Sequence, residues 1–174
     1  MGKTWWQKLY NGRDPKAVIL AKPYCGVQAG SKLFVATPLL VKEFIEAIPG
    51  GESTTVSRMR DDLAAQWDAD VTCPTSTGIF VRIVAEAALE DLANGAPENR
   101  ITPFWRVVDE TSPVVAKLSC GREFIRRKRE SERLPRYSNK GTPLCIPPNS
   151  TKMVSTSASP PTSTRASITR RRMR

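Results

Sequence analysis

The 174-residue chain contains no histidine, and its four cysteines show no Cys-x-x-Cys spacing. Without an imidazole, the chain cannot form a His-dependent catalytic triad, and most zinc-site patterns are excluded as well. No run of 18 apolar residues is present, so the sequence predicts no membrane-spanning helix. We therefore expect free thiols, no metal ion and no cofactor.

Acidic side chains are scarce towards the C-terminus. Residues 122–174 hold 14 Lys or Arg but 3 Asp or Glu, whereas residues 1–121 hold 13 and 14, so the net charge of +10 belongs to the C-terminal part. Residues 134–174 are rich in Pro, Ser and Thr. Such a composition buries too little apolar surface to offset the entropy of ordering. It predicts a disordered basic tail that raises DNA affinity without sequence preference.

Residues 1–36 show no clear periodicity, and we expect an irregular N-terminal segment. Two short apolar runs, Val18-Ile19-Leu20 and Leu33-Phe34-Val35, predict either strands or plugs against the rest of the domain. The N-terminus lacks the apolar stretch of a signal peptide, which favours a cytoplasmic protein, associated with the nucleoid if it is prokaryotic. At 40% hydrophobic residues, the composition suits one modest core with appendages.

Helical patterns begin at Thr37-Pro38, where an N-cap residue precedes a proline at the first helical position. A second helix is expected from Val56 to about Trp67, with apolar residues at spacings of three and four. Arg58 lies in its first turn, where a cation either contacts a phosphate or is simply solvated. Residues 68–74 read as an enlarged turn before the next helix.

The third helix is expected to begin near Thr77 and Gly78 and to end near Ala93. Hydroxyl side chains and a glycine at its start would admit a phosphate close to the positive end of the helix dipole. Together the patterns predict an α+β, mainly helical fold with one domain over residues 37–133, in which the second and third helices form a helix-turn-helix.

The stretch Ile101–Val108 combines a proline, two adjacent aromatic residues and an arginine, namely Pro103, Phe104, Trp105 and Arg106. Flat aromatic faces suit stacking on a flipped base. The same two rings, next to Val107 and Val108, equally suit a hydrophobic core. The sequence leaves both roles open.

Residues 39–132 resemble the DNA-binding domain of the O6-alkylguanine-DNA alkyltransferase family, whose hallmark is Pro-Cys-His-Arg-Val. Pro103, Arg106 and Val107 match it, but Phe104 stands in the place of the acceptor Cys and Trp105 in the place of the base His. The chain is in this respect similar to the alkyltransferase-like proteins, which lack the acceptor Cys and bind alkylated DNA without repairing it. The resemblance implies a winged-helix domain without catalysis.

Further positions carry the same resemblance. Arg82 matches the arginine that enters the duplex in place of the flipped nucleotide, although it could instead pair with Glu86 on the same helix. Residues 114–121 resemble the wing. Glu132 matches the Glu that orients the family's His, and with Trp105 in the His position it has no imidazole to orient.

The resemblance implies a monomer that binds double-stranded DNA, recognises alkylated guanine by base flipping and marks it for excision-repair proteins. Its DNA-contacting residues would be Arg58, Thr77, Gly78, Arg82, Pro103, Phe104, Trp105 and Arg106. Two alternatives remain open at this point. One is a general DNA-binding or regulatory winged-helix module without lesion preference. The other is a divergent alkyltransferase that uses a relocated thiol, Cys73 or Cys120.

Overall fold

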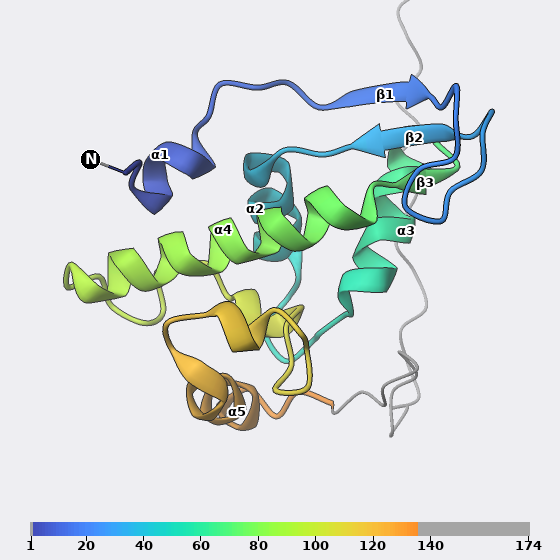
Figure 1. The fold of residues 1–174 in the computed structure, drawn as a ribbon. Helices are drawn as coiled ribbons and strands as arrows, with labels where there is room; N and C mark the ends of the chain where they lie inside the picture. Colours follow the sequence, from blue (N-terminus) through green and yellow to red (C-terminus); the bar gives the residue numbers. More distant parts are fainter. Residues whose placement is uncertain (1, 136–174) are drawn as a thin grey trace, which may run out of the picture.

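The computed structural model describes residues 2–135, and most of the predicted tail, residues 136–174, lies outside this range. The described part is an α+β fold, mainly helical, with one small sheet (Figure 1). Helix α4 crosses the middle of the molecule, with α1 and the sheet on one side of it and α5 on the other. No helix within residues 2–135 has both the length and the apolar character that crossing a bilayer requires.

The N-terminal segment is more regular than expected. It contains α1 (Trp5–Leu9) and two strands, β1 (Lys16–Ile19) and β2 (Lys32–Val35), which pair antiparallel. A third strand, β3 (Val71–Thr72), pairs parallel with β2 and completes the sheet. The connection predicted as an enlarged turn therefore contains a strand, because its backbone finds hydrogen-bond partners in residues far away in the sequence.

Helices α2 (Pro38–Ala47) and α3 (Val56–Gln66) confirm the sequence prediction closely. The hydroxyl of Thr37 accepts a hydrogen bond from the amide of Leu40 at 3.2 Å, and Pro38 occupies the first helical position. The hydroxyl of Thr55 caps α3 in the same way, accepting from the amide of Arg58 at 3.1 Å. Such side-chain caps supply partners for amide groups that the helix itself leaves unpaired.

Helix α4 (Pro74–Ala93) is the central element of the core. It starts three residues before Thr77, since Pro74 takes the first helical position. It packs against α1, α2 and α3 and against the short 3-10 helix η1 (Phe104–Arg106). Its inward side chains are mostly small or β-branched and allow close packing on several sides; the buried ones are Thr77, Val81, Val84, Ala85, Glu86, Ala87 and Ala88.

The C-terminal part differs from a wing. Residues 115–117 form a second 3-10 helix, η2 (Val115–Lys117), where the resemblance implied a wing. Helix α5 (Gly121–Ser131) follows and is buried along Ile125 and Arg129. Leu134 is 8% exposed and packs on the core, so the fold includes the first residue of the segment predicted as a tail.

Candidate functional site

The two aromatic residues of the stretch Ile101–Val108, called the hallmark stretch below, belong to the core. Phe104 is fully buried and Trp105 is 2% exposed. Their rings meet edge to face at 5.4 Å between centroids, and Phe104 stacks on Phe124 at 6.2 Å. Of the two roles left open by the sequence, the structure shows the core role, because a ring without exposed surface has no face to offer a base.

Glu132 joins this stretch to the end of α5. One carboxylate oxygen accepts a hydrogen bond from the indole nitrogen of Trp105 at 2.7 Å, and the other accepts one from Nε of Arg106, also at 2.7 Å. Burial raises the pKa of Glu132, but the hydrogen bonds from Arg106 and Trp105 outweigh burial, so the pKa lies below its ordinary value. No imidazole is present for Glu132 to orient, and its carboxylate instead binds Trp105 and Arg106.

Arg106 fastens the hallmark stretch to the turn between α2 and α3. Its NH1 group donates to the carbonyl of Ile48 at 2.6 Å, and its own carbonyl accepts from the amide of Thr54 at 2.8 Å. Pro103, which is partly buried, precedes η1. Arg106 thus connects η1 to the turn between α2 and α3, and its side chain is only 17% exposed.

At the start of α4 the predicted residues divide into buried and open positions. Thr77 is fully buried, and its hydroxyl donates to the carbonyl of Cys73 at 2.8 Å, so it cannot reach a ligand. Gly78 is open, since a Cβ placed there would meet no atom within 4 Å. The exposed stripe of the helix consists of the exposed Thr75 and Ile79 and the partly exposed Arg82, spaced by four and three residues. Ile79 is 54% exposed.

Arg82 lies at the end of this stripe and is 41% exposed. Its Nε is 4.0 Å from an oxygen of Glu86, which makes the contact on the same helix that the sequence offered as an alternative. Glu86 is only 5% exposed and accepts hydrogen bonds from the amide and hydroxyl of Ser119, at 3.2 and 2.8 Å. The Arg82 guanidinium also lies 5.4 Å from the ring centre of Trp5.

Arg58 lies exposed in the first turn of α3, where the sequence predicted it, whereas no sequence signal positioned the N-terminal aromatic residues. Arg58 is exposed on α3, and its Nε pairs with Asp62 at 3.1 Å. The contact between Trp5 and Arg82 had no signal in the sequence beyond two adjacent tryptophans near Lys8, because 77 positions separate the partners. The Sγ of Cys25 lies 3.2 Å from the hydroxyl of Thr75, which brings the β1–β2 loop to the start of α4.

The two thiols considered as alternative acceptors, Cys73 and Cys120, are buried and partly buried. Cys73 is 4% exposed, and burial raises the pKa of the Cys120 thiol, which favours its protonated form. Alkyl transfer needs a thiolate, so neither environment favours that chemistry. Within residues 2–135, no three Cys, Asp or Glu side chains come together in a way that could hold a metal ion.

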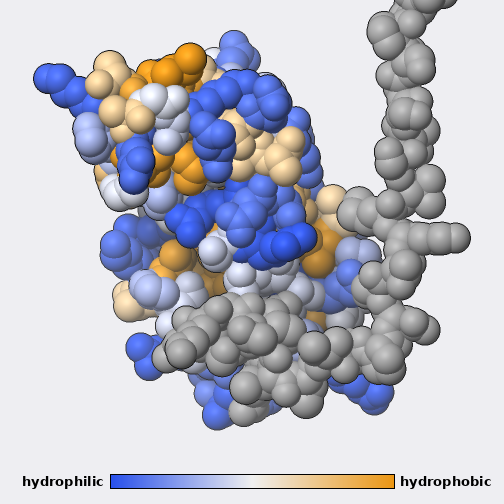
Figure 2. Space-filling model, turned by 90° about the vertical axis from the view of Figure 1, so that its right-hand side faces the viewer, coloured by the Kyte–Doolittle hydropathy of each residue, from blue (hydrophilic) through white to orange (hydrophobic). Residues whose placement is uncertain are grey.

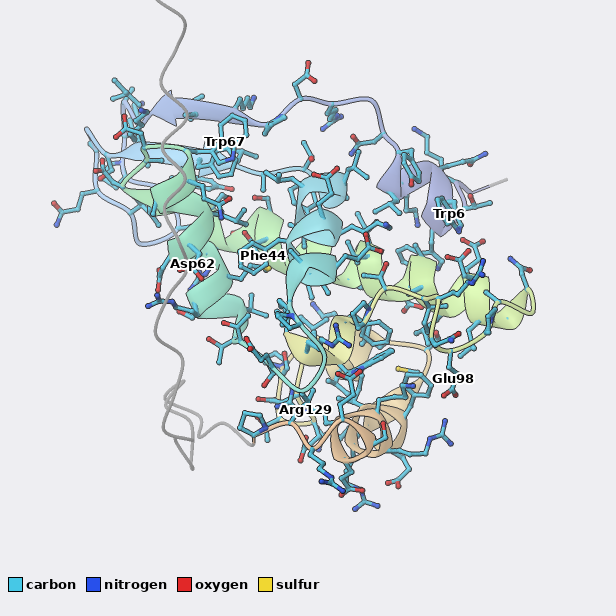
Figure 3. All side chains as sticks on the ribbon, turned by 180° about the vertical axis from the view of Figure 1, so that it is seen from behind. Trp6, Phe44, Asp62, Trp67, Glu98 and Arg129 are labelled. Carbon is cyan, nitrogen blue, oxygen red and sulfur yellow. The ribbon has the colours of Figure 1, made fainter. Side chains whose placement is uncertain are left out.

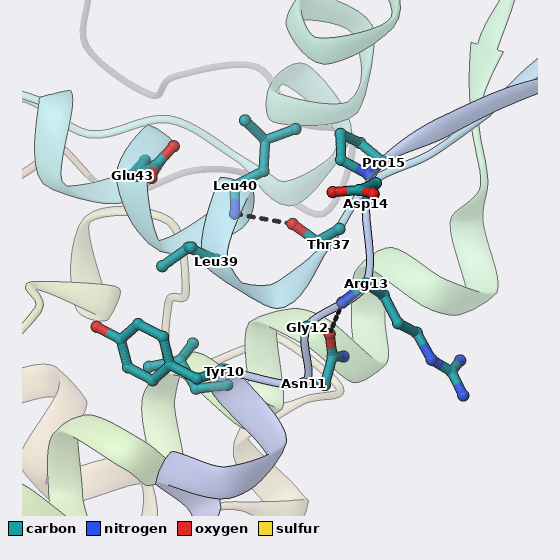
Figure 4. A pocket seen from close by; sticks show the side chains of 11 residues that line it. Tyr10, Asn11, Gly12, Arg13, Asp14, Pro15, Thr37, Leu39, Leu40 and Glu43 are labelled. Carbon is teal, nitrogen blue, oxygen red and sulfur yellow. Dashed lines mark hydrogen bonds between the residues drawn. The ribbon is translucent and has the colours of Figure 1, made fainter.

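Two surface features lie apart from this site. A shallow cavity of about 440 Å³ separates α2 from the link between α1 and β1, and Arg13, Asp14 and Glu43 are among its lining residues (Figure 4). Hydrophobic surface also gathers in the upper part of Figure 2, at the end of the molecule where Figure 1 places the sheet. On β1, Ile19 is 75% exposed. None of the residues predicted for DNA contact lines the cavity or belongs to β1.

Comparison with known proteins gives no match: no family model, no curated protein and no solved structure is similar enough to this chain to be identified as a relative. The site therefore has to be interpreted from its own residues and their geometry.

Proposed function

We propose that this protein binds double-stranded DNA, without catalysis, through the exposed stripe of α4. The observation that carries the proposal is the stripe itself: Thr75 and Ile79 are exposed and Arg82 is partly exposed on the first half of a 20-residue helix that follows α3. Its start carries the positive end of the helix dipole, and Gly78 leaves room for a close backbone. These properties suit a helix that enters the major groove by its N-terminal part.

A helix-turn-helix of winged-helix type is part of this proposal. Helices α3 and α4 would form the motif, with β3 in their connection. Since η2 takes the place that a wing would have, the helix must supply most base contacts made by residues 2–135.

The charge distribution supports different roles in DNA binding for residues 2–135 and residues 136–174. Residues 2–135 hold 19 Lys or Arg and 17 Asp or Glu, whereas residues 136–174 hold 8 and none. The folded part is nearly neutral, so it has little long-range attraction for DNA. In the proposed complex the basic C-terminal residues supply affinity that depends on salt, and the α4 stripe sets the position on the duplex.

Recognition of alkylated guanine is the finer part of the proposal. Arg82 would enter the duplex and fill the place of the flipped base, and the complex would mark the damage for excision-repair proteins. The Arg82 side chain is 41% exposed, and its 4.0 Å contact with Glu86 is long for an ion pair. To enter the duplex, the guanidinium would leave Glu86 and the ring of Trp5. The flipped base would require a stacking surface other than the buried rings of Phe104 and Trp105.

A general DNA-binding module without lesion preference is the second candidate. The burial of Phe104 and Trp105 favours it, because the predicted stacking pocket is filled by the rings themselves. A divergent alkyltransferase has less support, since Cys73 is buried and the pKa of Cys120 is raised.

The test is a titration of the full chain, at fixed moderate salt, with two duplexes identical except for one O6-methylguanine. We expect Ile79→Glu to weaken binding of both duplexes to the affinity that the basic C-terminal residues alone supply, and Arg82→Ala to remove the preference for the modified duplex. Ile19→Glu, on the exposed strand β1, is the matched control and should bind like the parent chain. Equal losses in Ile79→Glu and Ile19→Glu would contradict an interface on α4. Equal affinity of the parent chain for both duplexes would favour the general module.

A further inference from the structure

Trp5, Lys8 and Arg82 form a cluster of one aromatic ring and two cations at the junction of α1 and α4. The Lys8 ammonium lies 3.8 Å from the ring centre of Trp5, and the Arg82 guanidinium carbon lies 5.4 Å from the same centre. Trp5 and Lys8 are both partly exposed. Arg82 also ends the exposed stripe of α4, so the cluster continues the proposed DNA interface onto α1.

Helix α1 has docking contacts besides those of the Trp5 side chain, which also packs against the core. The indole nitrogen of Trp6 donates to Asp91 at 2.5 Å, and the Trp6 amide donates to Glu90 at 3.3 Å. Leu9 is 2% exposed within the core, and a capping box closes the start of the helix. Trp6 can be followed beside α4 in Figure 3. The partly exposed Trp5 is therefore carried by a helix that keeps several docking contacts when the indole is changed.

Neither cation of the cluster has a short ion pair within residues 2–135, since the Arg82–Glu86 contact measures 4.0 Å. Within residues 2–135, no carboxylate oxygen lies within 4.0 Å of the Lys8 ammonium. The Nε of Arg82 is buried and has no hydrogen-bond partner in the same range, because the Glu86 oxygens bond to Ser119. A buried donor without a partner is costly, and an incoming acceptor would relieve that cost.

We propose that Trp5, Lys8 and Arg82 bind one extrahelical nucleotide of DNA, with its base on the indole of Trp5 and its phosphate between the two cations. The inference rests on the proposed function, since it names the stacking surface that Phe104 and Trp105 do not provide. An indole stacks on any base, and ammonium and guanidinium groups both bind phosphate. The flexible Lys8 side chain would leave the ring for the phosphate as the base arrives.

The experiment uses the full chain and two duplexes, one fully paired and one with a single unpaired 2-aminopurine. Binding is measured at moderate salt, together with the fluorescence of the 2-aminopurine, which falls when the base stacks. We expect about tenfold tighter binding of the unpaired duplex and quenching on binding. Trp5→Leu should lose both, Trp5→Phe should keep most of both, and Lys8→Gln should weaken binding of the unpaired duplex while quenching at saturation persists.

Trp67→Leu is the matched control. Trp67 is 39% exposed, stacks on Phe34 at 4.8 Å, and lies well away from Trp6 in Figure 3. This variant should keep the preference and the quenching. Thermal unfolding of each variant checks that the fold is intact. If Trp5→Leu retained the quenching, or if the parent chain showed neither quenching nor preference while binding paired DNA through Ile79, the inference would be wrong and the proposed function would stand. If Ile79→Glu left paired-DNA binding unchanged, the proposed function itself would fail.

Discussion

The indole nitrogen of Trp105 donates a hydrogen bond to Glu132 across 27 positions of sequence, at 2.7 Å. Arg106 uses the other oxygen of the same carboxylate at the same distance. One side chain at the end of α5 therefore holds two neighbouring residues of η1. Glu132 therefore connects the hallmark stretch to the end of α5, and its substitution should lower the stability of the fold.

Glu132→Gln should lower the free energy of unfolding by about 1–3 kcal/mol, because the partly buried Arg106 guanidinium is left without its counter-charge. The side chains of Glu132 and Arg106 are 20% and 17% exposed. Denaturant unfolding measures the effect. Glu123→Gln is the control on the same helix: that carboxylate is 77% exposed, pairs with the exposed Arg126, and should change stability very little. Equal effects of the two substitutions would argue against the structural role of Glu132.

The contribution of Glu132 should depend on pH. Its pKa in the folded chain lies below the ordinary value of 4.5, so folding favours the ionised form. A lowered pKa adds stability that is fully present above the pKa of the unfolded chain and is lost as pH falls through the folded pKa. The stability difference between the parent chain and Glu132→Gln should be largest near neutral pH and shrink below pH 4.5. A difference that stayed constant far below that pH would be inconsistent with this coupling.

Phe104→Ala should cost about 3–5 kcal/mol in unfolding free energy, because it opens a cavity beside Trp105 and Phe124. Ile79→Ala provides the contrast. Ile79 is 54% exposed, so its truncation should leave stability nearly unchanged while weakening DNA binding. Unfolding and DNA titration of both variants separate a core residue from an interface residue. If Phe104→Ala were as stable as the parent chain but no longer bound DNA, Phe104 would be an interface residue rather than a core residue.

A chain ending at Pro135 should bind all duplexes more weakly and with less dependence on salt. The deleted residues carry 8 Lys or Arg and no acidic residue. Every DNA phosphate that is no longer neutralised reduces the slope of log affinity against log salt by about 0.9. The preference for O6-methylguanine should persist in the shortened chain, because Arg82 remains. If the shortened chain lost that preference, the C-terminal residues rather than Arg82 would recognise the modified guanine.

Local signals predicted the helices well. Thr37-Pro38 marked the start of α2 and Thr55 the start of α3, because caps act over three or four residues and are visible in the sequence. The general α+β, mainly helical class followed from such patterns. The strands were less predictable: β1 is exposed along its whole length, and β3 has only two residues. Neither is long enough for an alternating pattern to show.

The candidate site was predictable only in part. Arg82 and Gly78 lie at open positions of α4, but Thr77 is buried, since the helix begins earlier than its hydroxyl-rich run suggested. Whether Phe104 and Trp105 face a pocket or the core depends on Phe124 and Glu132, which lie 20 and 27 residues further along the chain from them. The cluster around Trp5 depends on how α1 docks, and no local pattern encodes that.

The parallel pairing of β3 with β2 determines how far the segment from α3 to α4 can be treated as a separable module. Strand β3 lies between α3 and α4, and it is hydrogen-bonded to a strand that ends at Val35, before α2 begins. A fragment starting at Thr37 would leave β3 without a partner and uncover the core beneath Phe34. The segment from α3 to α4 is therefore not expected to keep its structure when it is expressed alone or grafted onto another protein. It would lack β2, the strand that pairs with β3 and so fixes the connection between the two helices.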